Sequence, residues 1–112
     1  MINTREDFPI HVRTRWLDYS PALHWHTRTR FEAALRSSAS RIRWVNVRIS
    51  GSDGDLAKRV CDVEVVMKTD GIVAASAADS DAYRAADAAA RRVRTVVRRH
   101  VDRAREELRR AA

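Results

Sequence analysis

Arginine is the residue type whose number and spacing most clearly suggest a chemical role in this chain. The 112 residues include 22 Lys and Arg against 15 Asp and Glu, and all but two of the basic residues are arginines. The excess is local, because residues 91–112 hold nine arginines and only three acidic residues. A guanidinium donates two parallel hydrogen bonds to a phosphate, so a dense group of arginines can bind a polyanion such as nucleic acid. The alternative is a solvated helix face, since arginine is also a good helix former.

The spacing of apolar residues predicts a long amphipathic helix that would carry these arginines, over about 81–110. We expect Ser80 or Asp79 to be its N-cap. The expected apolar stripe consists of Tyr83, Ala86, Ala90, Val93, Val97, Val101, Ala104 and Leu108. The other side carries one row of Arg84, Arg91, Arg98 and Arg105 and a second row of Arg92, Arg99, Arg103 and Arg110.

The rest of the sequence predicts a sheet and one more helix. Alternating apolar residues predict a strand over about 9–15, and Ser20-Pro21 begins a helix of about 21–36. Three consecutive antiparallel strands are expected at about 42–50, 59–68 and 72–78, with a mobile loop at 51–55. The fold class is therefore α+β: a β-α-β-β-β-α two-layer sandwich with a four-stranded sheet and two helices on one face.

Length and composition limit the class of protein. We expect one domain over 1–112, with an ordered core of about 9–108. The apolar stretches are too short to span a membrane, and the acidic start does not resemble a secretory signal. The chain has one cysteine, Cys61, which fits a reducing cytoplasm.

Metal binding and catalysis have little support. The candidate ligands are His11, His24, His26, His100 and Cys61, but His24 and His26 point to different sides of a helix. Cys61 fits the buried face of a strand, and we expect His100 to be a satisfied residue at the edge of the apolar stripe. The sequence has no phosphate-binding glycine loop or nucleophile motif. We therefore expect no enzyme activity, no metal or other cofactor and no small-molecule substrate.

The three tryptophans, Trp16, Trp25 and Trp44, have two possible roles. Exposed tryptophans can stack on unpaired bases, whereas in a small domain they more often fill the core or its rim. Trp44 is out of phase with Val45, Val47 and Ile49, which predicts that it lies on the uncovered face of the sheet.

Residues 71–87 resemble the fourth strand and second helix of a known family. The matching elements are Gly71 at a hairpin, Ala75-Ser76-Ala77 in a strand and Asp81-x-Tyr83-x-Ala85-Ala86-Asp87 at a helix start. The basic residues that follow, up to Arg103, are similar to those of the same helix. The family is that of the ribosome hibernation-promoting factors, which includes the ribosome-associated inhibitor A proteins. The resemblance is to its short form, with a divergent first half, and the family fold is similar to double-stranded-RNA-binding domains.

The resemblance implies a function in translation. Members bind the rRNA of the small ribosomal subunit, block the mRNA and tRNA sites and silence idle ribosomes under stress in stationary phase. We expect a cytoplasmic protein that is monomeric when not bound to the ribosome. We expect the RNA contacts to come from Arg84, Arg91, Arg92, Arg98, Arg99 and Arg103. Two alternatives remain open: an RNA-binding protein without ribosome preference, and an interaction module whose basic helix binds an acidic protein.

Overall fold

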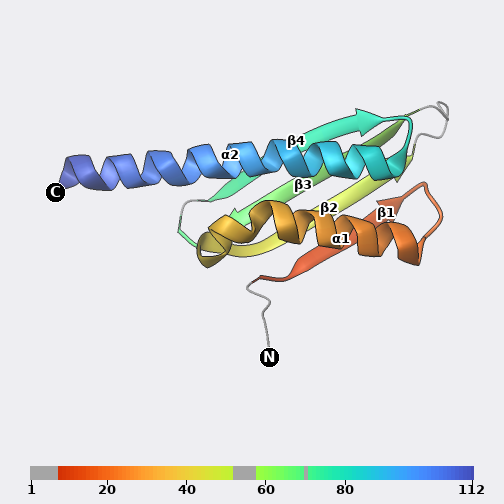
Figure 1. The fold of residues 1–112 in the computed structure, drawn as a ribbon, viewed down its shortest axis with the longest axis horizontal. Helices are drawn as coiled ribbons and strands as arrows, with labels where there is room; N and C mark the ends of the chain where they lie inside the picture. The colour runs from red at the N-terminus through yellow and green to blue at the C-terminus, as the bar shows by residue number, and fades with distance from the viewer. Residues whose placement is uncertain (1–7, 52–57, 70) are drawn as a thin grey trace.

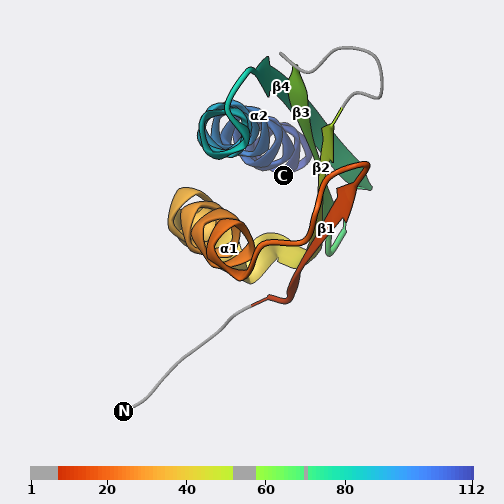
Figure 2. The ribbon, with the colours of Figure 1, turned by 90° about the vertical axis from the view of Figure 1, so that its right-hand side faces the viewer.

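Four strands form one sheet, and two helices pack side by side on the same face of it (Figures 1 and 2). The computed structural model describes residues 8–51, 58–69 and 71–112. The predicted α+β sandwich and its β-α-β-β-β-α order are confirmed. The elements are β1 (Ile10–Arg15), α1 (Pro21–Leu35), a 3-10 helix η1 (Arg36–Arg41), β2 (Ile42–Gly51), β3 (Arg59–Met67), β4 (Ile72–Asp79) and α2 (Ala82–Ala111).

The strands lie in the order β1-β2-β3-β4. β1 runs parallel to β2, because the chain crosses through α1 between them. The next two pairs are antiparallel, as the short connections predict. The register aligns Val12 with Val47 and Val47 with Val63, so one face of the sheet is apolar across the central strands.

Both helices bury their apolar side against this face. α1 contributes Leu23, Thr27, Phe31 and Leu35, which recur every four residues and are all buried. α2 contributes Val93 and Val97, which are at most 1% exposed. Burying a side chain of this size stabilises the fold by about 1.5–3 kcal/mol. The helix pair is thereby fixed to the sheet, and its polar sides remain available to solvent.

The helix starts are set by side-chain caps. At α1, Ser20 Oγ accepts a hydrogen bond from the Leu23 N–H at 3.2 Å, and Pro21 occupies the first turn, as predicted. At α2 the predicted cap is wrong by one or two residues. Asp81 is the N-cap and accepts from the Tyr83 N–H at 2.8 Å, while Asp79 accepts from the Asp81 N–H.

The apolar stripe of α2 is shorter than predicted. Tyr83 and Leu108 are 38% and 67% exposed, whereas Ala85 and Ala89, which the predicted stripe omits, are fully buried. The last buried residue is Val101, because the helix continues past the end of the sheet (Figure 1). Helical periodicity alone does not indicate where the surface that covers a helix ends.

Two glycines lie at the ends of strands. Gly71 has a φ of +81°, a backbone region that favours glycine, and its carbonyl accepts from the Met67 N–H. Gly51 ends β2 as a buried residue rather than beginning a loop, and residues 52–55 of the predicted loop lie outside the described residues. Within the described ranges, no helix is long and apolar enough to cross a membrane.

Candidate nucleic-acid interface

The arginines of α2 are positioned by the buried side of that helix. Val93, Val97 and Val101 pack on the sheet, so the positions between them must point sideways or outward. All six arginines predicted as contacts are exposed: Arg84, Arg91, Arg92, Arg98, Arg99 and Arg103. Helical spacing divides them into two rows on the outer side of α2, one nearer to α1 and one nearer to β4.

The first row, Arg84, Arg91 and Arg98, lies nearer to α1 than the second row, although Arg91 also lines a hollow with Ser76 of β4. Asp87 defines this side of α2, because its carboxylate contacts His26 Nε2 at 2.8 Å and Arg30 Nε at 3.4 Å, both on α1. Arg91 and Arg98 follow Asp87 at four and eleven residues, so they continue the same side of the helix. Arg84 to Arg98 extends over about 21 Å of helix.

The second row, Arg92, Arg99 and Arg103, lies toward β4. The guanidinium of Arg92 donates a hydrogen bond to the Ser76 carbonyl at 2.6 Å, across the outer strand of the sheet. Arg99 and Arg103 follow seven and eleven residues later and continue this side. Arg92 therefore has a structural contact in addition to its charge, and Arg99 and Arg103 project beyond it.

The charges of the two rows are not neutralised within the described part of the chain. None of the six arginines has an ion-pair partner there. At the end of α2, by contrast, Arg109 and Arg110 share Glu106, with the shorter pair at 2.6 Å. The uncompensated positive charge is therefore concentrated between Arg84 and Arg105, on a helix whose backbone is already ordered before any phosphate binds.

The histidines and the cysteine are dispersed. His26 packs edge-on against the Tyr83 ring, with centroids 4.9 Å apart, and pairs with Asp87, while His24 lies near Tyr19. His11 lies on the face of the sheet opposite the helices. Cys61 is buried, as predicted. Among the residues that the structure describes, no three His, Cys, Asp or Glu side chains gather in a group that could hold a metal ion.

His100 differs from its prediction. It lies at the edge of the apolar stripe and is half-buried, but its Nε2 atom is buried without a hydrogen-bond partner among the described residues. The spacing of residues along α2 located the side chain correctly. It could not show that the neighbouring elements supply no acceptor or donor.

The three tryptophans are all exposed. Trp44 is 38% exposed and pairs with Val66, on the uncovered face of the sheet, as predicted. Trp16 follows β1 and is 66% exposed, and Trp25 is 69% exposed on α1. The interpretation of Trp16 and Trp25 as core or rim residues is therefore wrong.

Sequence reasoning missed the contacts between helices and at the sheet edge. Asp87 joins His26 and Arg30 across 61 and 57 positions of the sequence, and Arg92 reaches a backbone carbonyl of β4. The spacing of His26 and Arg30 by four residues places them on one side of α1. Nothing in the sequence identified their partner.

The comparisons with known proteins agree with this architecture. The family model described as "Sigma 54 modulation protein / S30EA ribosomal protein" matches residues 10–105. The chain therefore belongs to this family, the family of the ribosome hibernation-promoting factors, and the resemblance stated from residues 71–103 is confirmed. The family associates the chain with the ribosome and with the regulation of translation. A search of curated proteins by sequence found no match.

Solved structures share the fold at low sequence identity. A ribosomal subunit interface protein from Coxiella burnetii superposes with a TM-score of 0.74 at 18% identity, over 84% of this chain and 98% of that one. The N-terminal domain of Protein Y from Thermus thermophilus gives a TM-score of 0.68 at 22% identity, over 80% of this chain and 94% of that one. At these identities the similarity establishes the fold.

Proposed function

We propose that this chain binds the rRNA of the small ribosomal subunit through the two arginine rows of α2 and inhibits translation by occupying the mRNA and tRNA sites. The observation that carries the proposal is the uncompensated charge of the six exposed arginines on one rigid helix. Family membership supports the ribosome as the target. Binding would need no catalysis and no cofactor, and the protein would act as a cytoplasmic monomer.

The physical basis is the release of counterions. Each rRNA phosphate that an arginine neutralises releases condensed cations, so binding weakens as salt rises. Structured RNA is recognised largely by shape and through its phosphates and 2′-hydroxyls, and a rigid cationic helix can reach these groups. The two rows diverge around α2, so they can contact phosphates on two sides of an RNA cleft.

The test replaces each row separately. One variant carries Arg92, Arg99 and Arg103→Gln, and the other carries Arg84, Arg91 and Arg98→Gln. Glutamine has a helix propensity close to that of arginine, so α2 should remain folded. We expect each variant to bind small subunits more weakly, with a slope of log affinity against log salt that is shallower by about two to three units.

The matched control removes the same number of charges elsewhere. Arg36, Lys58 and Lys68→Gln changes three exposed basic residues that are dispersed over η1 and the strand ends. Binding should be measured by co-sedimentation with purified subunits at several salt concentrations, after melting temperatures have been compared. If both row variants bind like the control, the arginines form a solvated face and the proposal is wrong.

The same assay distinguishes the two alternatives. An RNA-binding protein without ribosome preference would bind naked RNA as tightly as subunits at the same salt. An interaction module for an acidic protein would keep its partner after nuclease treatment.

A further inference from the structure

The face of the sheet opposite the helices is not covered by any described element (Figure 2). Alternation along β1 places His11, Arg13 and Arg15 on this face, since the residues between them point toward the helices. On β2 the same alternation places Trp44, Asn46 and Arg48 on this face, where Trp44 and Arg48 are exposed and Asn46 is half-buried. The two strands run parallel, so these side chains form a double row along β1 and β2.

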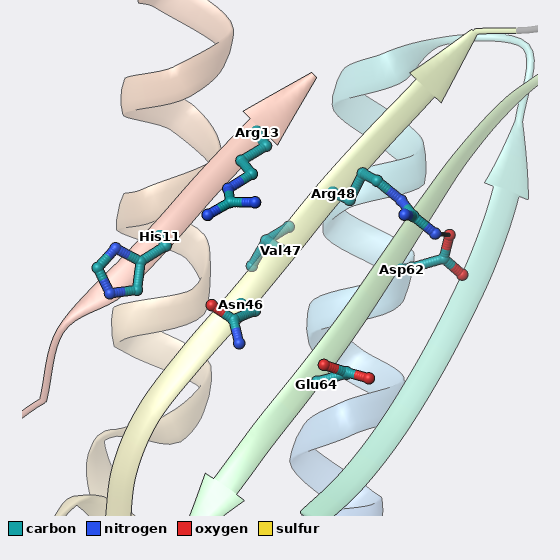
Figure 3. A pocket seen from close by; sticks show the side chains of 7 residues that line it. All are labelled: His11, Arg13, Asn46, Val47, Arg48, Asp62 and Glu64. Carbon is teal, nitrogen blue, oxygen red and sulfur yellow. Dashed lines mark ion pairs between the residues drawn. The ribbon is translucent and has the colours of Figure 1, made fainter. Parts of the chain in front are cut away.

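The middle of this double row is hollowed. The register places His11 beside Asn46 and Arg13 beside Arg48. These four side chains line a hollow of about 300 Å³ together with residues of β3, as Figure 3 shows. Arg13 has no ion-pair partner among the described residues, and Arg48 has only the Asp62 carboxylate at 3.7 Å. The hollow thus has guanidinium groups on its β1 and β2 side, while the carboxylates of Asp62 and Glu64 line its β3 side.

Exposed tryptophans stand at both ends of the double row. Trp44 lies two residues before Asn46 on the same face of β2, and Trp16 directly follows Arg15. The Arg15 guanidinium lies over the Trp16 ring, 4.3 Å from its centroid. The two ends are separated by about 20 Å, the length of a six-residue strand. We call the surface from Trp44 through His11, Arg13, Arg48 and Arg15 to Trp16 the sheet track.

The backbone of Trp16 also indicates a functional surface. Its φ of 57° makes it the one described non-glycine residue with positive φ. A large side chain in this region is strained, and such strain persists where the surrounding structure imposes it, often at functional sites. Here the strained residue presents an aromatic ring to solvent, although burial of that ring would stabilise the fold.

We propose that the sheet track binds single-stranded RNA, with phosphates on Arg13, Arg15 and Arg48 and bases stacked on Trp44 and Trp16. A cationic groove with aromatic platforms is the arrangement by which proteins bind single strands without reading sequence. Asp62 and Glu64 line the β3 side of the same hollow, and their repulsion of phosphates would confine the strand to β1 and β2. The inference rests on the proposed function for its biological setting, but the surface lies on the opposite side of the sheet from α2.

The experiment titrates the full-length protein with an oligouridylate of ten nucleotides at several salt concentrations. Binding is measured by anisotropy of an end-labelled oligonucleotide and by quenching of tryptophan fluorescence. We expect saturable quenching by the wild type. Arg13→Gln with Arg48→Gln should weaken binding about tenfold and make the salt slope shallower by about one to one and a half units. Trp44→Leu should weaken binding about tenfold through loss of one stacked base.

Two controls make the test specific. Trp25→Leu removes a tryptophan of similar or greater exposure from α1, on the other side of the molecule, and should leave the affinity unchanged. Asp62→Asn with Glu64→Gln should increase the affinity, because it removes the repulsion and releases Arg48 from its ion pair. All substituted side chains are at least partly exposed, and comparison of melting temperatures verifies that the fold is retained.

The proposal would be overturned by an absence of saturable binding, or by track variants that bind the oligonucleotide like the wild type. It would also be overturned if only the α2 row variants lost oligonucleotide binding, since the single strand would then lie on α2. Its failure is distinguishable from failure of the proposed function, which is measured on small subunits with those row variants. If the wild type does not bind the oligonucleotide but a track variant loses ribosome association, the track contacts a protein. That outcome would reject the RNA assignment.

Discussion

The burial of Cys61 in the sheet changes the pKa of its thiol and thereby the pH dependence of stability. Its side chain lies in β3 on the apolar face and is fully buried. Burial, with a smaller contribution from the negative charge of Asp62, raises the pKa of its thiol from 9.0 to about 12. The folded protein therefore keeps Cys61 protonated at pH values where the unfolded chain would lose the proton.

This shift predicts an alkaline loss of stability. Below pH 9 both states hold the proton and the contribution of Cys61 is fully present, whereas between about pH 9 and 12 it falls by up to about 1.4 kcal/mol per pH unit. Urea unfolding of the wild type and of Cys61→Ala should be compared at pH 8, 9 and 10. The variant should be less stable at pH 8 because of its cavity, and the difference should narrow as pH rises. A constant difference would contradict the raised pKa.

At the same scale, the sequence predicted the exposure of the arginines but not their contacts. Exposure follows from helical periodicity, which places Arg91 and Arg98 away from Val93 and Val97. The hydrogen bond from Arg92 to Ser76 depends on how close α2 lies to β4, and the contacts of Asp87 depend on how α1 lies against α2. Such distances are set by packing between elements, which a local pattern does not contain.

At the scale of elements, alternation and turn residues predicted the strands to within one or two residues. Three details were not predictable because they arise where elements meet. β2 has an irregular register between Ile42 and Trp44, Trp16 adopts a positive φ, and Asp81 rather than its neighbours caps α2. Gly51 is a fourth case, since the Trp16 carbonyl approaches its backbone so closely that an added Cβ would lie 2.5 Å from the oxygen.

The two strand-end glycines should therefore respond differently to substitution. Gly51→Ala must displace the backbone after β1, and we expect a loss of about 2–3 kcal/mol in the free energy of unfolding. Gly71→Ala meets no atom within 4 Å but is strained by its φ of +81°, and should cost about 1 kcal/mol. Urea unfolding of both variants measures the difference. If Gly51→Ala proves no more destabilising than Gly71→Ala, the Trp16 carbonyl does not lie as close to Gly51 as the structure places it.

At the scale of the whole molecule, the two faces of the sandwich have different chemistry. The helical side carries the arginine rows on α2, while the open side of the sheet carries the sheet track and its two tryptophans. The sequence predicted the first surface because nine arginines gather in residues 91–112. It could not predict the second, because residues 11–16 and 44–48 are brought together only by the parallel pairing of β1 with β2.

The end of α2 that projects past the sheet carries charged residues but contributes little to the stability of the fold. Residues 105–111 are all exposed; Glu106 forms ion pairs with Arg109 and Arg110, and Glu107 and Leu108 line an open hollow with Arg41 and Thr69. Exposed pairs of this kind contribute only a few tenths of a kcal/mol. A chain that ends after Ala104 should therefore melt within about 4 °C of the full chain.

The control for this truncation is a chain that ends after Val96. It removes Val97 and Val101, which are 1% and 7% exposed, and should not fold cooperatively. The shorter truncation removes eight residues whose net charge is +1, so the salt slope of small-subunit binding should change by less than about one unit. Thermal unfolding followed by circular dichroism and the co-sedimentation assay measure both quantities. A large drop in melting temperature after removal of 105–112 would mean that the projecting end packs against another surface, such as a second copy of the chain. That result would contradict the proposed monomeric state.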